Sequence, residues 1–564
     1  MKLPVGGEHN MIRNKFSGSF WQWYLPAILP FLAGGFHTYT AALTAVLVAA
    51  PLIRHCCTGT PFRIVINLST AAVCTIVLGY WVTLLWAADR GMAVFGILRS
   101  FPILLLALLQ MQGIEKTPLW TRIPHCGTAM TLLSCGLYIF PGMRDFVTVN
   151  GRLSGFLQYP NTFAAFLLVC VAVQGTKKHH HADWILDAIL VLGIILSGSR
   201  TGLLILILLL FGISLLRSKL HPAAAVAVAG GMLLICSFWV LSGNRITVLG
   251  RDLGSLFVRI LYYKDALPVI LRHPFGLGYL GYRALETTFQ TSRYTVLFVH
   301  SGLLQMLLDV GWIPAFLLAA AIIKTLCAPG TDPTARMVLL VLSAHALVDF
   351  DLQFFLFWVI LLLCLDFETG KVYCLRIPKG LGFSVMVPIL ALCLWLGAGD
   401  WCYQTGNTTL ALKITPFHTD ALAAAMKTAD DPEALDQLAD KVLALNPTQA
   451  LAYSAKANAA YARGQIPEMM QYKETAIRLT PYTTEEYCDY IEKLYSVLEF
   501  YVRSGDQESA VYCLNKLLEI PEWMQEVTAG TDPLAFQTGN NSEVVLPEQY
   551  QRLLTELAKA NPNR

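Results

Sequence analysis

Long apolar runs separated by short polar segments dominate the first 400 residues of the chain. A membrane-spanning helix needs about 17–25 mostly apolar residues, and slightly shorter runs are accommodated where the bilayer thins. This pattern predicts about 13 spans joined by loops of both short and moderate length. They lie near residues 20–36, 38–53, 64–88, 92–112, 126–141, 160–175, 183–197, 202–216, 222–242, 298–323, 337–349, 352–367 and 381–399.

The pattern changes after Trp401, where the apolar runs stop and Ala, Leu, Tyr, Glu and Lys recur at helical spacing. Pro447 and Pro481 each close a helix and stand 34 residues apart, the period of a tetratricopeptide repeat. Residues 400–564 therefore resemble a tetratricopeptide-like α-helical domain, with an irregular helical bundle as the alternative. The residues at the large, small and turn positions of such a repeat are Tyr453, Ala457, Ala460, Gly464 and Ala476.

The composition supports a membrane protein. Hydrophobic residues make up 55% of the chain and charged residues only 14%, whereas soluble domains carry about 25% charged residues. We therefore expect an all-α fold, in which a polytopic bundle of membrane helices precedes the helical repeat domain. The net charge of +3 gives no indication of a nucleic-acid partner.

Positive charges near the ends of the predicted spans give an orientation. Lys and Arg are frequent in alternate loops, whereas the short loops between them carry only Arg90, Arg144, Arg152 and Arg200. Because cytoplasmic loops are enriched in Lys and Arg, this bias predicts that the N-terminus lies inside. An odd number of spans then places the C-terminal domain outside. The expected organisation is a cytoplasmic segment 1–19, a membrane domain 20–399 with an external loop 243–297, and an extracytoplasmic domain 400–564.

The external loop 243–297 is long for a connection between two helices, and long ordered loops are usually functional. Seven Arg and Lys residues and only three acidic residues lie in it. Its segment from Arg259 to Arg272 has the pattern of an amphipathic helix, in which Arg259, Tyr263 and Asp265 are close enough to share a face. An interfacial helix without chemistry is the alternative interpretation.

Three further external segments carry candidate functional residues. Arg152 and Asn161 flank Pro160, which is suited to the first turn of a helix, and a positive helix end beside an Arg suits a phosphate. Arg200 stands at the tip of the turn Leu196-Ser-Gly-Ser-Arg-Thr-Gly202, where it either binds an anion or extends toward lipid headgroups. His300 is expected at the mouth of a long apolar helix, where a neutral imidazole beside arginines is able to accept a proton.

In this order, these segments resemble the O-antigen ligase/polymerase superfamily, bacterial membrane glycosyltransferases that use undecaprenyl-diphosphate-linked glycans. The resemblance covers roughly residues 140–365 and includes Ala344-His-Ala-Leu-Val-Asp-Phe350, which adds His345 and Asp349 as secondary candidates with Asn161, Tyr263 and Asp265. Two positions depart from the family pattern: Ser301 follows the histidine where Asn is usual, and Asp309 replaces a usual Glu.

The resemblance implies a glycosyltransferase at the outer face of a bacterial plasma membrane. Arg152, Arg200 and Arg259 would bind the lipid diphosphate, and His300 would take a proton from the acceptor hydroxyl. Neither a metal nor another cofactor is expected. The expected partners are the lipid-linked glycan donor, a glycan, lipid or protein acceptor, membrane lipids, and a protein docked on the C-terminal repeats.

Ligation of a finished glycan, polymerisation of repeat units and transfer to protein all remain open. A lipid-linked glycan exporter or an assembly scaffold without catalysis is the alternative class. An exporter would be expected to carry charged residues within its spans, which in this sequence are nearly free of charge.

Overall fold

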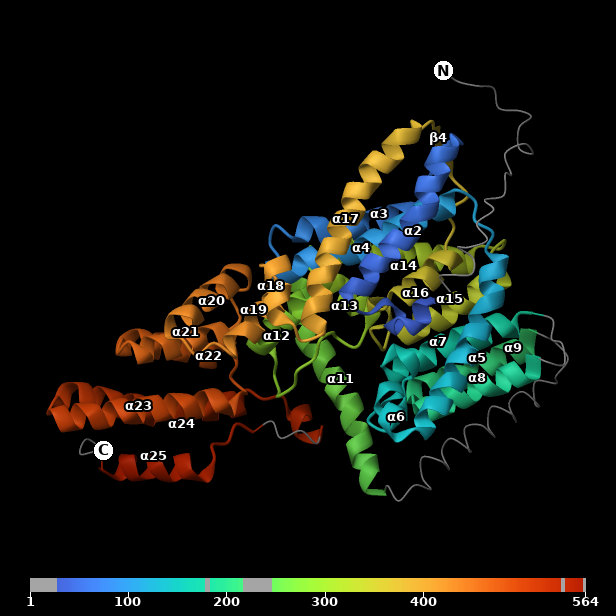
Figure 1. The fold of residues 1–564 in the computed structure, drawn as a ribbon. Helices are drawn as coiled ribbons and strands as arrows, with labels where there is room; N and C mark the ends of the chain where they lie inside the picture. Colours follow the sequence, from blue (N-terminus) through green and yellow to red (C-terminus); the bar gives the residue numbers. More distant parts are fainter. Residues whose placement is uncertain (1–27, 178–182, 217–245, 539–542, 561–564) are drawn as a thin grey trace, which may run out of the picture.

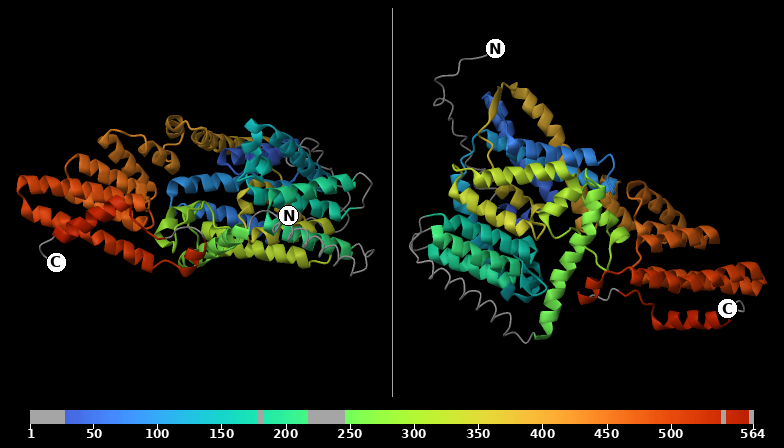
Figure 2. Two further views of the ribbon diagram at one scale, coloured as in Figure 1. Left: turned by 90° about the horizontal axis from the view of Figure 1, so that it is seen from below. Right: turned by 180° about the vertical axis from the view of Figure 1, so that it is seen from behind.

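The computed structural model describes residues 28–177, 183–216, 246–538 and 543–560. Helix accounts for 76% of the structure, which confirms the predicted all-α class. Figure 1 shows a membrane-type bundle formed by the N-terminal two thirds of the chain, from which the C-terminal helices project to one side. Figure 2 shows from two further directions that these C-terminal helices extend away from the bundle.

The bundle consists of apolar helices whose ends are defined by local sequence. Asp89 caps α4 by accepting a hydrogen bond from the backbone N–H of Met92, and Pro160 occupies the first position of α7. The helices are α2 (Thr38–Thr58), α3 (Leu68–Thr83), α4 (Arg90–Met111), α5 (Thr117–Ile139), α6 (Pro141–Val147), α7 (Pro160–Gly175), α8 (Asp183–Ser197), α9 (Arg200–Leu216), α11 (Ile246–Arg272), α12 (Gly281–Phe289), α13 (Gly302–Val310), α14 (Trp312–Cys327), α15 (Pro333–Ala346), α16 (Phe355–Cys364) and α17 (Lys379–Gln404).

Short elements connect these helices. Two 3-10 turns precede α2, and one precedes each of α7 and α16. Strands β1 and β4 join loops that are distant in sequence, whereas β2 and β3 form a local hairpin. These elements are η1 (Leu29–Phe31), η2 (Ala33–Gly35), η3 (Gly155–Leu157), η4 (Asp351–Gln353), β1 (Phe62–Ile66), β2 (Thr148–Val149), β3 (Arg152–Leu153) and β4 (Lys371–Leu375).

Most predicted spans coincide with a helix, but the number of 13 spans is not confirmed. Three described helices are long and apolar enough to cross a membrane by themselves: Thr38–Thr58, Arg90–Met111 and Gly380–Gln404. Several others are apolar but only 10–17 residues long. The predicted N-terminal segment 1–19, most of the span 20–36 and the span 222–242 lie outside the described residues.

One predicted span is wrong. The run 298–323 does not form one long helix with His300 at its mouth; it divides into α13 and α14 at Gly311, whose φ is 86°. The turn that follows α11 packs against this break, because the carbonyl of Pro274 accepts a hydrogen bond from Trp312 N at 2.9 Å. Gly278 N likewise donates to the carbonyl of Asp309 at 3.0 Å. Helix α13 is therefore a separate short helix, whose C-terminal end hydrogen-bonds to the turn that follows α11.

The loops of the bundle fall into two groups, one at each end of the helices. At one end, β1 pairs antiparallel with β4, with Phe62 opposite Leu375. At the same end Lys116 Nζ donates to the carbonyl of Leu365 at 3.1 Å. The charge pattern predicts that all these loops lie on the cytoplasmic side. The other end carries Arg152, Asp349 and the contacts with the C-terminal domain, so loops predicted on one side of the membrane lie together.

The C-terminal domain is a stack of antiparallel helix pairs with its own apolar cores (Figure 1). Turn glycines such as Gly505, at φ 79°, end helices and reverse the chain. The elements are α18 (Thr408–Ile414), α19 (Thr419–Met426), α20 (Pro432–Leu445), α21 (Ala450–Ala462), α22 (Ile466–Leu479), α23 (Thr484–Ser504), α24 (Gln507–Ala529), η5 (Pro533–Gln537) and α25 (Glu548–Ala560).

The break at Gly311 generates a testable prediction about stability. A Cβ at Gly311 would lie 2.4 Å from the carbonyl oxygen of Pro274, whereas a Cβ at Gly505 would meet nothing within 4 Å. Gly505 is in the left-handed helical region, where alanine costs about 1–2 kcal/mol in backbone strain. Gly311, with φ 86° and ψ −172°, is in a region that is essentially restricted to glycine. Gly311→Ala adds a clash with backbone, and we expect a clearly larger drop in the apparent Tm of the detergent-solubilised protein than for Gly505→Ala. Equal drops would contradict this account of the break.

Candidate active site

Four chain segments that are distant in sequence meet at one end of the bundle. They are the β3–α7 segment with Arg152 and Asn161, the middle of α11 with Arg259 and Tyr263, the loop around His300, and residues 348–350 after α15. Each contributes at least one polar side chain, and one carboxylate, that of Asp349, contacts three of the four segments.

Asp349 lies at the centre of these contacts and is only 1% exposed. Its Oδ2 accepts hydrogen bonds from Asn161 Nδ2 at 2.8 Å and from an Arg259 guanidinium nitrogen at 3.2 Å. Its Oδ1 accepts from Phe350 N at 2.9 Å and lies 3.4 Å from Nδ1 of His300. Burial opposes ionisation, but the contact with His300 and the charge of Arg259 hold the pKa of Asp349 below its ordinary value.

Arg152 is the second cation of the site. Its Nε donates to the carbonyl of Ser197 at 2.8 Å, and one terminal nitrogen donates to Asn161 Oδ1 at 2.7 Å. Asn161 therefore connects Arg152 to Asp349. The Ser-Gly-Ser-Arg turn packs against Arg152, since a Cβ at Gly198 would lie 3.4 Å from its Nε.

Arg200, at the start of α9, is exposed and close enough to act on Arg152 electrostatically. Burial lowers the pKa of Arg152, and the charges of Arg200 and Arg259 act in the same direction. All three predicted arginines therefore lie in one electrostatic neighbourhood. The hydrogen-bond partners of Arg152 are neutral, and the carboxylate that pairs with Arg259 also contacts His300. Positive charge therefore exceeds negative charge here, which favours the binding of an anion.

Arg259 and Tyr263 stand one helical turn apart on α11 and face the same way. Arg259 donates to the carbonyl of Val348 at 2.8 Å in addition to Asp349. The hydroxyl of Tyr263 donates to the carbonyl of His300. Helix α11 thus fixes both the loop with Asp349 and the loop with His300.

The imidazole of His300 is 19% exposed and lies between aromatic rings. It stacks on Tyr262, with ring centroids 5.7 Å apart, and meets the edge of Phe350 at 5.1 Å. Its Nδ1 faces Asp349 and, at 3.4 Å, the hydroxyl of Tyr159. Within the described residues no hydrogen bond reaches Nε2. A proton on Nδ1 is favoured by the carboxylate, which leaves the Nε2 lone pair directed away from this contact.

The structure does not bring two of the predicted residues to this surface. Asp265 is buried on another face of α11, two residues and about 200° beyond Tyr263, so the expectation of a shared face is wrong. There it accepts hydrogen bonds from Thr291 N and Oγ1 and from Tyr294 Oη at 2.8–2.9 Å. His345 is fully buried and pairs with Asp351 through Nδ1 at 2.5 Å. Both residues serve the framework of the site.

Sequence reasoning missed a buried polar network behind the site, whose centre is Asp309. Its carboxylate accepts hydrogen bonds from Tyr80 Oη at 3.0 Å, Gln305 Nε2 at 2.8 Å and Gln353 Nε2 at 3.4 Å. Gln305 also accepts from Val299 N at 2.9 Å, directly before His300. The network therefore connects the histidine loop to the turn that follows Asp349.

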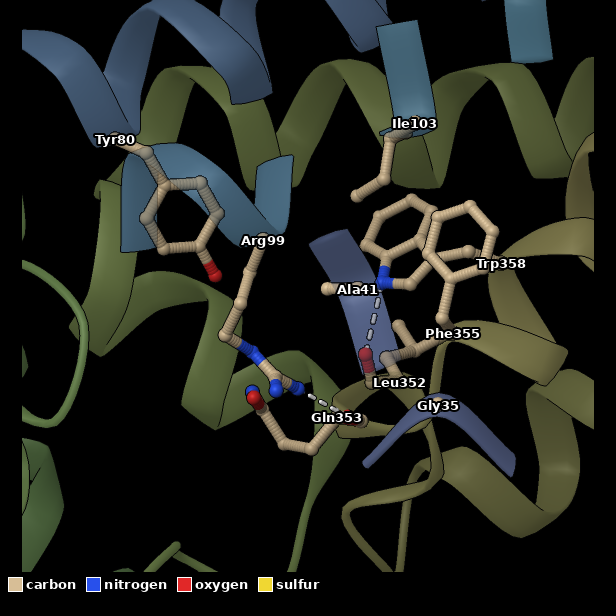
Figure 3. Close-up of a pocket in the computed structure, with 9 residues that line it drawn as sticks. All are labelled: Gly35, Ala41, Tyr80, Arg99, Ile103, Leu352, Gln353, Phe355 and Trp358. Carbon is tan, nitrogen blue, oxygen red and sulfur yellow. Dashed lines mark hydrogen bonds between the residues drawn. The ribbon is translucent and has the colours of Figure 1, made fainter. Parts of the chain in front are cut away.

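Arg99 joins this network from the middle of α4. It donates to the carbonyls of Phe36 and Gln353, and within the described residues it forms no ion pair. Figure 3 shows Tyr80, Arg99 and Gln353 on one side of a cavity whose other side is apolar. The volume open to a water-sized sphere is about 20 Å³, room for roughly one water. The sequence feature that could have indicated this network is Arg99 itself, a lone charge inside the apolar run 92–112. It shows that the spans are not all free of charge.

Comparison with known protein families finds a match over part of the chain. Residues 185–319 match the family model described as O-antigen ligase. The chain carries an O-antigen ligase family domain over these residues. The match contains Arg200, Arg259 and His300, whereas Arg152, Asn161 and Asp349 reach the same place only through folding. The predicted resemblance over 140–365 is thus confirmed for its central part.

The family match indicates a membrane function of the O-antigen ligase/polymerase type in polysaccharide assembly, with lipid-linked glycan substrates. It implies ligase activity of the glycosyltransferase kind. The comparisons give no evidence for tetratricopeptide repeats in residues 400–564. A search of curated proteins finds no match to the chain.

The framework of the site predicts a pH dependence of stability. Glu286 on α12 is 1% exposed, its carboxylate accepts a hydrogen bond from Val296 N at 2.8 Å, and burial raises its pKa to about 8. The folded protein therefore keeps this proton where the unfolded chain has lost it, and stability should fall as pH rises from about 4.5 toward 8. Glu286→Gln removes this titration and keeps the acceptor. We expect its apparent Tm, relative to the natural protein, to increase from pH 5 to pH 8.

The matched control is Glu508→Gln on the exposed surface of α24. The difference in apparent Tm between this variant and the natural protein should be the same at pH 5 and pH 8. A Glu286→Gln difference that is constant with pH would contradict the assignment of a buried, protonated Glu286.

Proposed function

We propose that this protein is a membrane glycosyltransferase that takes its glycan from an undecaprenyl-diphosphate-linked donor and ligates or polymerises cell-surface polysaccharide. The observation that supports this most strongly is the chain of contacts from Arg152 through Asn161 and Asp349 to Arg259, with His300 against the same carboxylate. Two cations, Arg259 on the Asp349 carboxylate and Arg152 linked to it through Asn161, with a candidate base beside them, suit a substrate with a charged leaving group and a hydroxyl nucleophile.

The arginines would bind the donor diphosphate. In the reaction the bond between the anomeric carbon and the diphosphate oxygen breaks, and negative charge collects on that oxygen. Guanidinium groups held in place by Asn161, Ser197 and Val348 stabilise this charge without reorganising. Bidentate donors are suited to phosphate, so Arg152 and Arg259 are the expected contacts, with Arg200 at the exposed edge.

His300 would activate the acceptor. The acceptor oxygen forms the new bond to the anomeric carbon, and its proton passes to Nε2 of His300. Asp349, 3.4 Å from Nδ1, stabilises the imidazolium that results. Tyr263 holds the loop through the carbonyl of His300, which orients the ring.

An exporter or a scaffold is less well supported. Arg99 is the mid-span charge that an exporter would be expected to use, but its guanidinium donates to two carbonyls, and the cavity beside it has room for about one water. A scaffold would need no partly exposed histidine against a buried carboxylate. Arg99 instead fits the role of an anchor between η2 and η4.

We further propose that the site and the C-terminal domain face the outside, where lipid-linked glycans are polymerised or ligated. The charge pattern of the loops and the grouping of the site with the C-terminal contacts support this orientation.

The direct test is to incubate the purified protein with a lipid-linked oligosaccharide donor and to identify the product. His300→Ala should reduce transfer by about 10²–10⁴-fold, the usual contribution of a general base. Donor binding should persist, because the arginines remain. His300→Gln should lose as much, since Gln keeps hydrogen bonding but accepts no proton. The matched control is His273→Ala, which should leave transfer nearly unchanged. His273 is half-buried and contacts no proposed site residue in the described structure.

Near-normal turnover of His300→Gln would assign His300 an orienting role and leave the acceptor without a base. Release of an unmodified donor to the opposite leaflet, without transfer, would instead support an exporter.

The orientation has its own test. A reporter that is active only outside the cytoplasm, fused after Arg564, should be active, and the same reporter fused in the loop 113–116 should be silent. The reverse pattern would overturn the proposed orientation.

A further inference from the structure

Among the residues of the C-terminal domain that contact the membrane domain, Asp532 reaches both α11 and the loop that leads to His300. Its carboxylate forms an ion pair with Lys264 Nζ on α11. Its backbone N–H donates to the carbonyl of Thr291 at 2.9 Å. One residue therefore contacts both the helix that carries Arg259 and the loop that leads to His300.

Both contacted residues are close to the site in sequence and in structure. Lys264 directly follows Tyr263, whose hydroxyl donates to the carbonyl of His300. Thr291 is held by Asp265 of the same helix through its N–H and its hydroxyl. From Thr291 the chain runs through Tyr294, also bound to Asp265, to His300. Asp532 thus adds a second connection between α11, through Lys264, and the histidine loop, through Thr291.

The position of Asp532 is fixed from the side of the C-terminal domain. It is 7% exposed, and its side chain caps η5 by accepting from Leu534 N at 2.9 Å. The preceding Thr531 hydrogen-bonds with the hydroxyl of Tyr482 at 3.0 Å, in the core near the start of α23. Helix η5 packs along α11. The contact is therefore built on the folded C-terminal domain.

We propose that Asp532 and Lys264 are positioning residues of the site, through which the C-terminal domain holds α11 and the histidine loop in register. This inference rests on the proposed function for its catalytic consequence, but its structural half is independent of it. Asp532 touches no proposed substrate position; it acts by ordering the residues that carry Arg259 and His300.

The expected effect is on order more than on global stability. Lys264 is 58% exposed, and exposed ion pairs contribute little to folding. Losing one charge-assisted contact should instead release the segment it restrains, because local opening depends on the few bonds that hold that segment.

The test uses the full-length protein in detergent and Asp532→Asn, which keeps a capping oxygen and removes the charge. Hydrogen exchange of the amides of residues 290–300 should become at least about fivefold faster, the factor that a bond of typical net strength supplies. Lys264→Met should act in the same direction, with the cap of η5 intact. The matched control is Asp506→Asn, because Asp506 also caps a helix of the C-terminal domain through Ser509 N but lies away from the site.

In the transfer assay, Asp532→Asn should lower kcat several-fold and leave donor binding nearly unchanged, whereas Asp506→Asn should behave like the natural protein. Unchanged exchange at residues 290–300 in both loss variants would overturn the proposal, whatever the outcome for catalysis. Faster exchange with an unchanged kcat would overturn the positioning role. A chain that transfers nothing but shows the expected exchange would refute the proposed function and leave the structural contact established.

Discussion

The arrangement of the site depends on one buried anion, the carboxylate of Asp349. An ionised carboxylate with almost no exposure is costly unless cations and hydrogen-bond donors surround it. Asn161, Arg259 and the N–H of Phe350 meet this requirement, and they come from three separate segments. Folding therefore brings Arg152, Arg259 and His300 together as a consequence of satisfying Asp349.

A second buried carboxyl group, that of Asp309, connects further segments behind the site. Its three donors include Gln305, which restrains the residue before His300, and Gln353, whose backbone is bound by Arg99. The position of Asp309 depends in turn on the break at Gly311, because the turn 274–278 hydrogen-bonds to the end of α13. Gly311, the carboxyl group of Asp309 and the loop of His300 are thus connected by hydrogen bonds, and Asp532 of the C-terminal domain contacts the same loop at Thr291.

Much of this was predictable from the sequence, and the parts that were not have a common cause. Apolar runs located most helices, since a helix in an apolar medium is determined by local composition. Polar residues beside those runs indicated Arg152, Arg259 and His300. The broken span was missed because a single Gly with apolar neighbours is compatible with a helix until another backbone approaches it. The expectation for Asp265 was wrong on spacing itself, since two residues turn a helix by about 200°. The anchoring role of Arg99 depends on the carbonyls of Phe36 and Gln353, which are distant in sequence and which spacing alone does not reveal.

The central claim is that Arg152 and Arg259, positioned by Asn161 and the carboxylate of Asp349, form a binding site for a lipid diphosphate with His300 beside it. The most direct measurement is an experimental structure of the protein in a lipid nanodisc with an undecaprenyl-diphosphate-linked glycan. The account predicts diphosphate density within hydrogen-bond distance of the guanidinium groups of Arg152 and Arg259, with the anomeric carbon on the side of His300. Diphosphate density at another place, with these arginines bound only to Asn161, Ser197, Val348 and Asp349, would contradict it.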